Sequence, residues 1–445
     1  MILKKNRIYQ YIFFLLLIIM TIFNGGNSNL YSQFNFISSA IFFLFFIRDK
    51  NYQANIQLIF RKSIVEFYLF IGFLLFLLFQ ILPLPLEFIK ILSPVKFQYL
   101  IDLEYDKNYS SISLNPSNTF FTFLNFFSIL IYLLIFKSLF YRSKDLLSFY
   151  FFIIILGGLC SGIGLYFYLI GNPDFLIFEN SFYKNSSTSF FINRTVFSCF
   201  LVLCFFCGAE YLRLFDNYKK ENTNNFFKKI HVRILIIFVT IGIITSFSKI
   251  GNFLLISFIF FYICKLLFEK EKKNSFFFKS LVLIVLVDIL ILGFYFGADK
   301  TIYRFSFLGE ELSGYLPNTF EEQITRGSLT FFGYSKIKDF IFFGYGAGSF
   351  ETLFKLNFPS LASYYADHAH SDIVEFLGEF GFIGFFLILS CIVISIIKNK
   401  LFYFKNLFLF YFFIILLIFD FTLHIPLIQL LLVFLISMKI EDKKT

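Results

Sequence analysis

Long apolar stretches alternate with polar segments along almost the whole chain of 445 residues. Twelve stretches are roughly 15 to 25 residues long, the length that lets a helix cross the hydrocarbon core of a bilayer. Only 15% of the residues are charged, too few for the surface of a soluble protein of this size. The pattern predicts an all-α polytopic membrane protein with about twelve transmembrane helices. The predicted spans are 8–23, 34–47, 64–82, 120–136, 146–170, 192–212, 234–247, 250–268, 280–297, 373–397, 406–420 and 425–438.

Lys and Arg residues test this arrangement independently of hydropathy. If the N-terminus is cytoplasmic and the sides alternate, 27 of the 39 basic residues fall on the inner side. Of the 29 acidic residues, 18 fall on the outer side. This asymmetry satisfies the positive-inside rule with both termini in the cytoplasm. The formal net charge of +10 is therefore a sign of topology, and no nucleic-acid partner is expected.

The longest polar interruption lies between the ninth and tenth spans, on the predicted outer side. Two amphipathic stretches, Leu86–Leu103 and the segment from Arg326 to about Phe343, are expected to lie on the membrane surface or to cap a cavity. The predicted regions are an N-terminal membrane domain with about nine helices (1–297), a large outer loop (298–372) and C-terminal membrane helices (373–445).

Ionisable residues at the outer ends of the spans are candidates for chemistry, because charge at membrane depth is costly unless it is used or paired. If a helix begins at Asp372, then Asp372, Glu375 and Glu379 share one of its faces, with His370 at the mouth of a cavity. Two alternatives stay open. Asp372 and Glu375 can simply cap a helix at the interface, or His368 and His370 can chelate zinc. The sequence places no further His or Cys ligand beside them, so no metal is expected.

Two cations on the predicted outer side occupy unusual positions. Arg194 lies just inside the sixth span, next to Asn193 and Thr195, and Lys249 lies in the tight turn between the seventh and eighth spans. A cation in such a position suits a lipid phosphate or diphosphate. The alternative for both is ordinary snorkelling toward lipid headgroups.

Two short motifs look functional but are interpreted as structural. Cys204 and Cys207 form a CxxC inside a predicted span, with no second pair and no neighbouring His, so they are expected to pack between helices. Gly344-Tyr-Gly346-Ala-Gly348 follows no βαβ pattern, so we expect a flexible turn and no nucleotide site.

The outer segments also carry an ordered set of motifs. His370-Ser371, nine further residues and then Gly381-Phe-Ile-Gly384 fit the pattern H-[NSQ]-x9-G-x-x-G. This order resembles the bacterial O-antigen ligase and O-antigen polymerase superfamily, in which the histidine motif ends a large periplasmic loop. Lys249 stands where the family's S-R-G turn carries Arg, which keeps the charge but loses the bidentate fork. The other resembling stretches are 80–94, 113–119, Arg326 with 344–350, and 420–426.

The resemblance implies a membrane glycosyltransferase C-like fold, with a ligase-related domain over approximately residues 235–400. It implies transfer of a glycan from an undecaprenyl diphosphate carrier to an acceptor hydroxyl at the periplasmic face of the bacterial inner membrane, without cofactor or metal. His370 matches the catalytic base, with a pKa expected near neutrality. Arg326 and Lys249 match the donor diphosphate-binding cations, to which position adds Arg194. The possible supporting residues are His368, Asp372, Glu375 and Glu379.

Three other functions stay open at this point. A ligase would pass the glycan to the lipid A core, whereas a polymerase would pass it to a growing glycan, and the histidine motif favours the ligase. A flippase for lipid-linked glycans can also have twelve spans, but transporters tend to show inverted repeats and midplane charges. Here no repeat is visible and Asp288 is the deep acidic residue. A non-catalytic scaffold would not need the histidines.

Overall fold

The computed structural model describes residues 2–174, 183–218, 223–268, 325–358, 366–398 and 404–438. Over these residues the protein is almost entirely helical, as predicted, and the sheet is one antiparallel pair of two-residue strands, β1 (Leu84–Pro85) and β2 (Tyr109–Ser110). The long helices are α1 (Ile2–Ile22), α2 (Asn29–Ile47), α4 (Ile64–Ile81), α7 (Pro116–Leu139), α8 (Ser143–Leu169), α9 (Arg194–Tyr218), α10 (Thr223–Thr245), α11 (Lys249–Phe268), α17 (Asp372–Lys398), α18 (Phe404–Phe419) and α19 (Pro426–Ser437).

The long helices confirm a polytopic membrane protein. Six of them (α2, α4, α7, α8, α9 and α17) are long and apolar enough to cross a bilayer, and α1, α11, α18 and α19 contain shorter apolar helices. The ninth predicted span, 280–297, lies outside the described residues, so the total of twelve stays a prediction. A helix that was not predicted, α3 (Lys50–Lys62), precedes α4.

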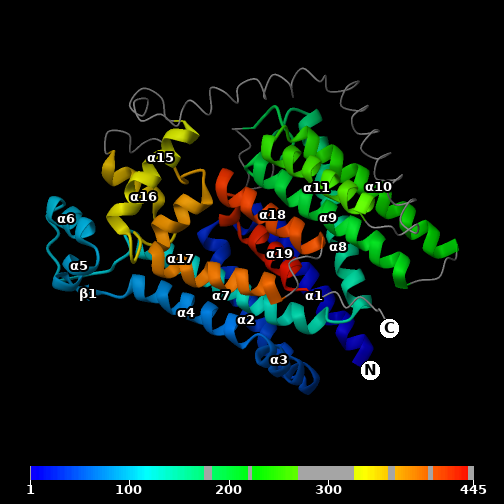
Figure 1. Cartoon of the computed structure of the whole chain (residues 1–445), viewed down its shortest axis with the longest axis horizontal. Coiled ribbons are helices and arrows are strands. Elements are labelled where there is room, and N and C mark those ends of the chain that lie inside the picture. The colour runs from blue at the N-terminus through cyan, green and yellow to red at the C-terminus, as the bar shows by residue number, and fades with distance from the viewer. Residues whose placement is uncertain are drawn as a thin grey trace.

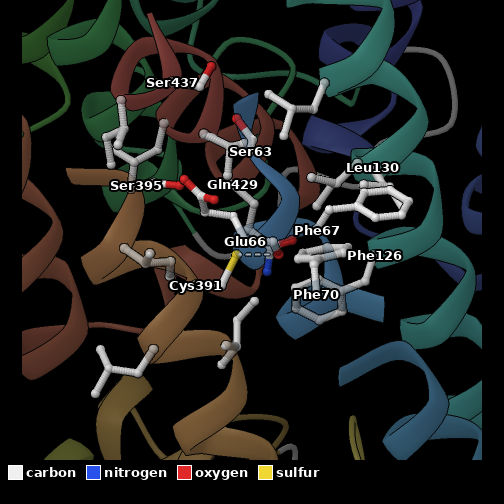
Figure 2. A pocket seen from close by; sticks show the side chains of 18 of the residues that line it. Ser63, Glu66, Phe67, Phe70, Phe126, Leu130, Cys391, Ser395, Gln429 and Ser437 are labelled. Atoms are coloured by element: carbon white, nitrogen blue, oxygen red, sulfur yellow. Dashed lines mark hydrogen bonds between the residues drawn. The ribbon is translucent and has the colours of Figure 1, made fainter. Parts of the chain in front are cut away.

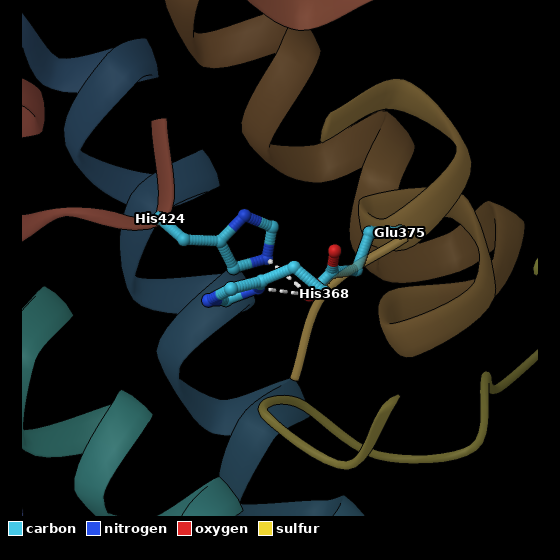
Figure 3. Close-up of side chains that lie close together, drawn as sticks. All are labelled: His368, Glu375 and His424. Atoms are coloured by element: carbon cyan, nitrogen blue, oxygen red, sulfur yellow. Dashed lines mark hydrogen bonds and ion pairs between the residues drawn. The ribbon is translucent and has the colours of Figure 1, made fainter. Parts of the chain in front are cut away.

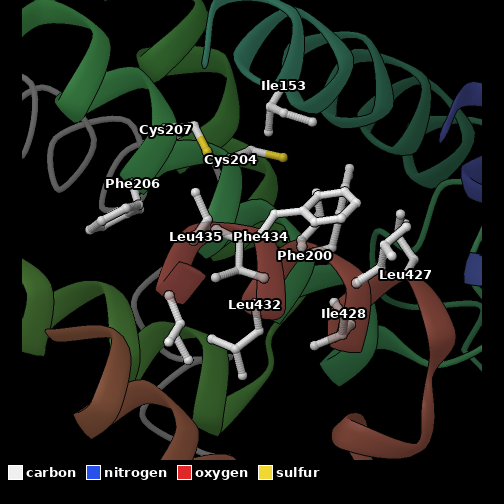
Figure 4. Close-up of a cluster of buried hydrophobic side chains, with 14 of the residues drawn as sticks. Ile153, Phe200, Cys204, Phe206, Cys207, Leu427, Ile428, Leu432, Phe434 and Leu435 are labelled. Carbon is white, nitrogen blue, oxygen red and sulfur yellow. The ribbon is translucent and has the colours of Figure 1, made fainter. Parts of the chain in front are cut away.

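The helices form two groups joined by α19 (Figure 1). Helices α8, α9 and α10 pack against one another, while α7 packs on α2 and α4, and α4 packs on α17. Helix α19 contacts both α7 and α9. Close to this junction, Cys204 and Cys207 lie among apolar side chains such as Phe200 and Phe434 (Figure 4). Both side chains are buried and neither forms a disulfide, an environment that fits the expected packing between helices.

Short helices cover those ends of α4, α7 and α17 that are predicted to lie on the outer side. They are α5 (Leu86–Leu92), α6 (Pro94–Asp102), α15 (Arg326–Ile337), η5 (Lys338–Phe340) and α16 (Phe350–Asn357). Both predicted amphipathic stretches are thus helical, and the first breaks at Ser93 because the residue before a proline disfavours helical backbone. Apolar residues of α15, η5 and α16 form a core separate from that of the membrane helices.

The glycine-rich turn 344–348 is packed into this outer cap, so the prediction of a flexible turn is wrong. Tyr345 N donates to Gly378 O at 2.9 Å, and Gly346 N donates to Glu379 O at 3.2 Å. Gln80 Nε2 donates to Phe343 O at 2.7 Å and to Glu379 O at 2.8 Å. Close approach of two backbones, and not flexibility, is the reason for the glycines. Three stretches that resemble the superfamily (80–94, 344–350 and the Gly381 motif) meet here.

Candidate functional site

The first turns of α17 carry three buried carboxylates on one face, as predicted from their spacing. The exposed fractions of Asp372, Glu375 and Glu379 are 0%, 1% and 1%. Two imidazoles from other segments lie beside Glu375 (Figure 3). His368 belongs to the loop before α17, and His424 ends the turn η7 (Thr422–His424) between α18 and α19. The structure therefore gathers a histidine–carboxylate cluster from residues 52 positions apart in the chain.

Glu375 ties the preceding loop to the helix. Its Oε1 lies 2.8 Å from His368 Nδ1, and its Oε2 accepts a hydrogen bond from Ala369 N at 2.8 Å. The His368 ring also stacks on Phe421, with ring centroids 4.4 Å apart and planes 11° from parallel. Glu375 therefore does not act as the capping partner of Asp372, whose N donates to Asp420 O at 2.8 Å, and it fixes the loop and His368 instead.

Asp372 does not cap its own helix, because its carboxylate points to the turn before α19. One oxygen accepts a hydrogen bond from Leu423 N at 2.8 Å, and the other pairs with His424 Nδ1. The opposite ring atom, His424 Nε2, lies 3.4 Å from Glu375 Oε1 and 3.6 Å from Glu379 Oε2. His424 is thus the centre of the cluster, and it was not among the predicted site residues. Its signal in the sequence was the turn 420–426, one of the resembling stretches.

The neighbouring carboxylates raise the pKa of both His424 and His368. Burial opposes the charged form of His424, but Glu375 and Asp372 outweigh burial and raise its pKa well above the usual value. Burial likewise opposes the charged form of His368, and Glu375 again prevails, so the pKa of His368 is raised. Positive charge is therefore favoured wherever the carboxylates converge.

His370, the predicted base, behaves differently. Its backbone is left-handed with φ +56°, an uncommon conformation for a residue other than glycine, and Thr330 Oγ1 holds the preceding carbonyl of Ala369 at 2.6 Å. Burial and the charge of Arg326 lower the pKa of His370 to about 3, so the expectation of a pKa near neutrality is wrong. The ring is neutral at physiological pH, and its Nδ1 is buried with no hydrogen-bond partner among the described residues.

The predicted cations fall into two groups. Arg326 begins α15 and is close enough to act electrostatically on both His370 and Asp420. Arg194 begins α9, with its guanidinium 5.2 Å from the centroid of the Tyr183 ring, and Lys249 begins α11. The starts of α9 and α11 touch each other, and α9 contacts η7. The structure thus brings Arg326 to His370, while the roles of Arg194 and Lys249 stay predictions.

An apolar groove runs between α4, α7, α17 and α19 (Figure 2), and one of its ends is lined by Phe376 and Leu423, next to the cluster. At that end Phe376 stacks on His424 with centroids 4.2 Å apart, and Gln429 Nε2 donates to Leu423 O at 2.5 Å. At the other end it is lined by Glu66 and Lys137. Most of the side chains that line the groove are apolar. This lining suits a long apolar chain.

The cluster also has the composition of a metal site. His368, Glu375 and His424 present ligand atoms that all lie within 4.8 Å of one another. The expectation of no metal rested on the lack of a further ligand near the two histidines of the loop. That reason no longer holds, because the fold brings His424, from the turn before α19, next to His368.

Comparison with known proteins agrees with the motifs. Residues 234–389 match the family model described as O-antigen ligase. That range includes Lys249, Arg326 and the whole segment from His368 to Gly381. No curated protein matches the chain in a sequence comparison. The family match, the ordered motifs and the helical membrane fold together support membership of the O-antigen ligase and polymerase superfamily.

Proposed function

We propose that this protein is an inner-membrane glycosyltransferase that moves a glycan from an undecaprenyl diphosphate carrier to an acceptor hydroxyl on the periplasmic side. The acceptor in this proposal is the lipid A core, which makes the protein an O-antigen ligase. The supporting observation is the position of His370, a neutral imidazole with an unpaired buried Nδ1 beside Arg326. The apolar groove next to the cluster adds the feature that a lipid-linked donor requires.

The reaction asks little chemistry of the protein, because diphosphate is already a good leaving group. Arg326, Lys249 and Arg194 bind its negative charge, which grows as the bond between the sugar anomeric carbon and the phosphate oxygen breaks. The acceptor oxygen forms the new bond to that carbon and gives its proton to His370. Arg326 is one cause of the low pKa of His370, so an anionic donor bound at Arg326 makes the imidazole a stronger base.

The groove explains how a lipid-linked donor is held in register with these residues. Its walls are apolar side chains of four helices, so a polyprenyl tail gains from leaving water at about 25 cal/mol per Å² of apolar surface. The tail runs toward the cytoplasmic end, where Glu66 Oε2 pairs with Lys398 Nζ at 2.7 Å. The diphosphate then lies at the outer end, next to Phe376 and the cluster.

The experiment is His370→Ala in a strain that depends on this protein, with gel analysis of surface glycans. We expect loss of glycan attachment at normal protein level. Intact carrier-linked polymer that never reaches lipid A identifies a ligase, whereas loss of polymer length identifies a polymerase. His231→Ala is the matched control, because that ring is exposed on α10 and contacts Phe227 O. Normal glycan ladders in His370→Ala would refute the proposal.

A further inference from the structure

We infer that His368, Glu375, Glu379 and His424 bind one divalent transition-metal ion, of which Zn²⁺ is the best match. This inference goes beyond glycan transfer, which the residues of the preceding section account for without a metal. It rests on four observations: the ligand spacing, two unpaired buried atoms, the support of the two rings, and the types of donor atom.

The spacing of the donor atoms around His424 is that of metal ligands. Zinc holds His and carboxylate ligands at about 2.0–2.2 Å, so neighbouring ligands of a tetrahedral ion lie about 3.3–3.6 Å apart. His424 Nε2 lies 3.4 Å from Glu375 Oε1 and 3.6 Å from Glu379 Oε2. Both separations exceed the usual N–H···O range, which ends at about 3.2 Å.

Two of the converging groups have an atom without a hydrogen-bond partner among the described residues. These atoms are His424 Nε2 and Glu379 Oε1. The Glu379 side chain is 1% exposed, so neither the charge nor the free lone pair of its carboxylate is satisfied by bulk water. His424 Nε2 and the other carboxylate oxygen, Glu379 Oε2, lie 3.6 Å apart, and a cation bound between the two groups would satisfy both of them.

His368 completes the set by exchanging a proton for the ion. Its Nδ1 lies 2.8 Å from Glu375 Oε1, which is a hydrogen-bond distance with the ring nitrogen as the donor. When the metal binds, the Nδ1 proton leaves to solvent and the lone pair turns to the ion. The two atoms then need to separate by only about 0.5 Å to reach the ligand spacing.

Both rings are already held in place. Asp372 pairs with His424 Nδ1, so Nε2 is the nitrogen that faces the ion and loses its proton to solvent when the metal binds; this carboxylate–histidine–metal arrangement is common at zinc sites. The other Asp372 oxygen is itself fixed by Leu423 N. Phe376 stacks on His424, and Phe421 stacks on His368. The fold therefore already holds both rings in place, so metal binding costs little additional side-chain entropy.

The donor types select the ion. Two imidazoles with carboxylates suit Zn²⁺ and its neighbours, whereas Mg²⁺ prefers oxygen ligands and water. Bound here, the ion would join the loop before α17, the first turns of α17 and η7, and so would fix the segment that carries His370. The rival assignment is that protons alone balance the cluster, with the imidazoles charged.

The test is metal analysis of the full-length protein in detergent, purified through a tag without histidine. After loading with Zn²⁺ and removal of free ion, we expect close to one zinc per chain, and a rise in melting temperature that a chelator reverses and Mg²⁺ does not reproduce. Glu379→Gln and His424→Gln should lose the zinc. Asp372→Asn should bind about 10–100-fold more weakly, because it only orients a ligand.

Two matched controls should retain the zinc. His231→Gln changes an exposed histidine of α10, and Glu351→Gln changes a carboxylate of α16 that pairs with Lys355 at 2.6 Å. Less than about a tenth of an equivalent in the wild-type protein would overturn the inference and favour the proton-balanced cluster. So would equal zinc in wild type and Glu379→Gln. The wild-type measurement stands even if a variant fails to fold, and it does not depend on transferase activity.

Discussion

Helix α17 contains a backbone conformation that glycine alone adopts readily, and its replacement tests how the outer cap is held. At Gly381 the backbone has φ +58° and ψ −175°, and the helix is kinked there. The kink lets Phe382 N donate to Ile341 O at 2.7 Å, and it lets the glycine-rich turn 344–348 dock on α17. The perturbation is Gly381→Ala.

The cost of that substitution has two parts. A residue with a side chain held in this region of φ and ψ costs of order 1–3 kcal/mol. In addition, the new Cβ would collide with Phe342 O and lie 2.6 Å from Gly344 N. Both are backbone atoms and cannot rotate away, so overpacking adds roughly 1–3 kcal/mol. We therefore expect Gly381→Ala to destabilise the folded protein by about 3 kcal/mol or more.

Two other glycines separate these contributions. Gly171 has φ +88° with no atom within 4 Å of a built Cβ, so Gly171→Ala carries the conformational cost without the collision. Gly162 lies inside α8 with equally open space, so Gly162→Ala should be neutral or gain up to about 1 kcal/mol of helix propensity. The expected order of stability is Gly162→Ala, then Gly171→Ala, then Gly381→Ala.

The chain offers a convenient probe for this series. It has no Trp, but Cys160, Cys199, Cys204 and Cys207 are buried cysteines that form no disulfide. A dye that fluoresces on reaction with thiols therefore reports melting of the purified protein in detergent. Gly381→Ala should lower the melting temperature clearly more than Gly171→Ala. If the two variants melt together, the collision with the glycine-rich turn contributes nothing and the reasoning is refuted.

Three further substitutions test other parts of the structure. Gln80→Leu leaves the buried carbonyls of Phe343 and Glu379 without a donor and should cost about 2–4 kcal/mol in the same thiol assay. Burial lowers the pKa of Lys96 to about 8 from 10.5. Between those two pH values the unfolded chain binds more protons than the folded protein, so the free energy of unfolding should rise from pH 8 to 10. Circular-dichroism melts of Lys96→Met should lack that rise. Lys249→Arg should retain glycan transfer, whereas Lys249→Ala should lower it by roughly 10- to 100-fold through loss of a charge-assisted contact.

Local pattern was sufficient for the helices and for part of the site. The length of each apolar stretch predicted the long helices, because a membrane helix needs a fixed number of apolar residues. Once a helix was taken to begin at Asp372, the shared face of Glu375 and Glu379 followed from helical periodicity. The low pKa of His370 did not, because it depends on burial and on Arg326, which is 44 positions earlier in the chain.

Contacts between segments that are far apart in the chain could not be predicted from the sequence. His424 meets Asp372 across 52 positions, and Gln80 meets Glu379 across 299. Neither pairing leaves a periodic trace, because hydropathy records which face of a helix is buried and not which helix buries it. The same limit produced the error at Gly344, where a glycine needed for close approach was interpreted as a sign of flexibility.

The nine residues between Ser371 and Gly381 have a physical meaning in this fold. They form about two and a half turns of helix, with the cluster at one end and the docked kink at the other. Since each residue turns an α-helix by about 100°, a change of one residue would rotate Glu375 away from His424 while the kink stays docked. The spacing therefore fixes the rotation of α17 between the cluster and the docked kink. Both of these contacts position His370.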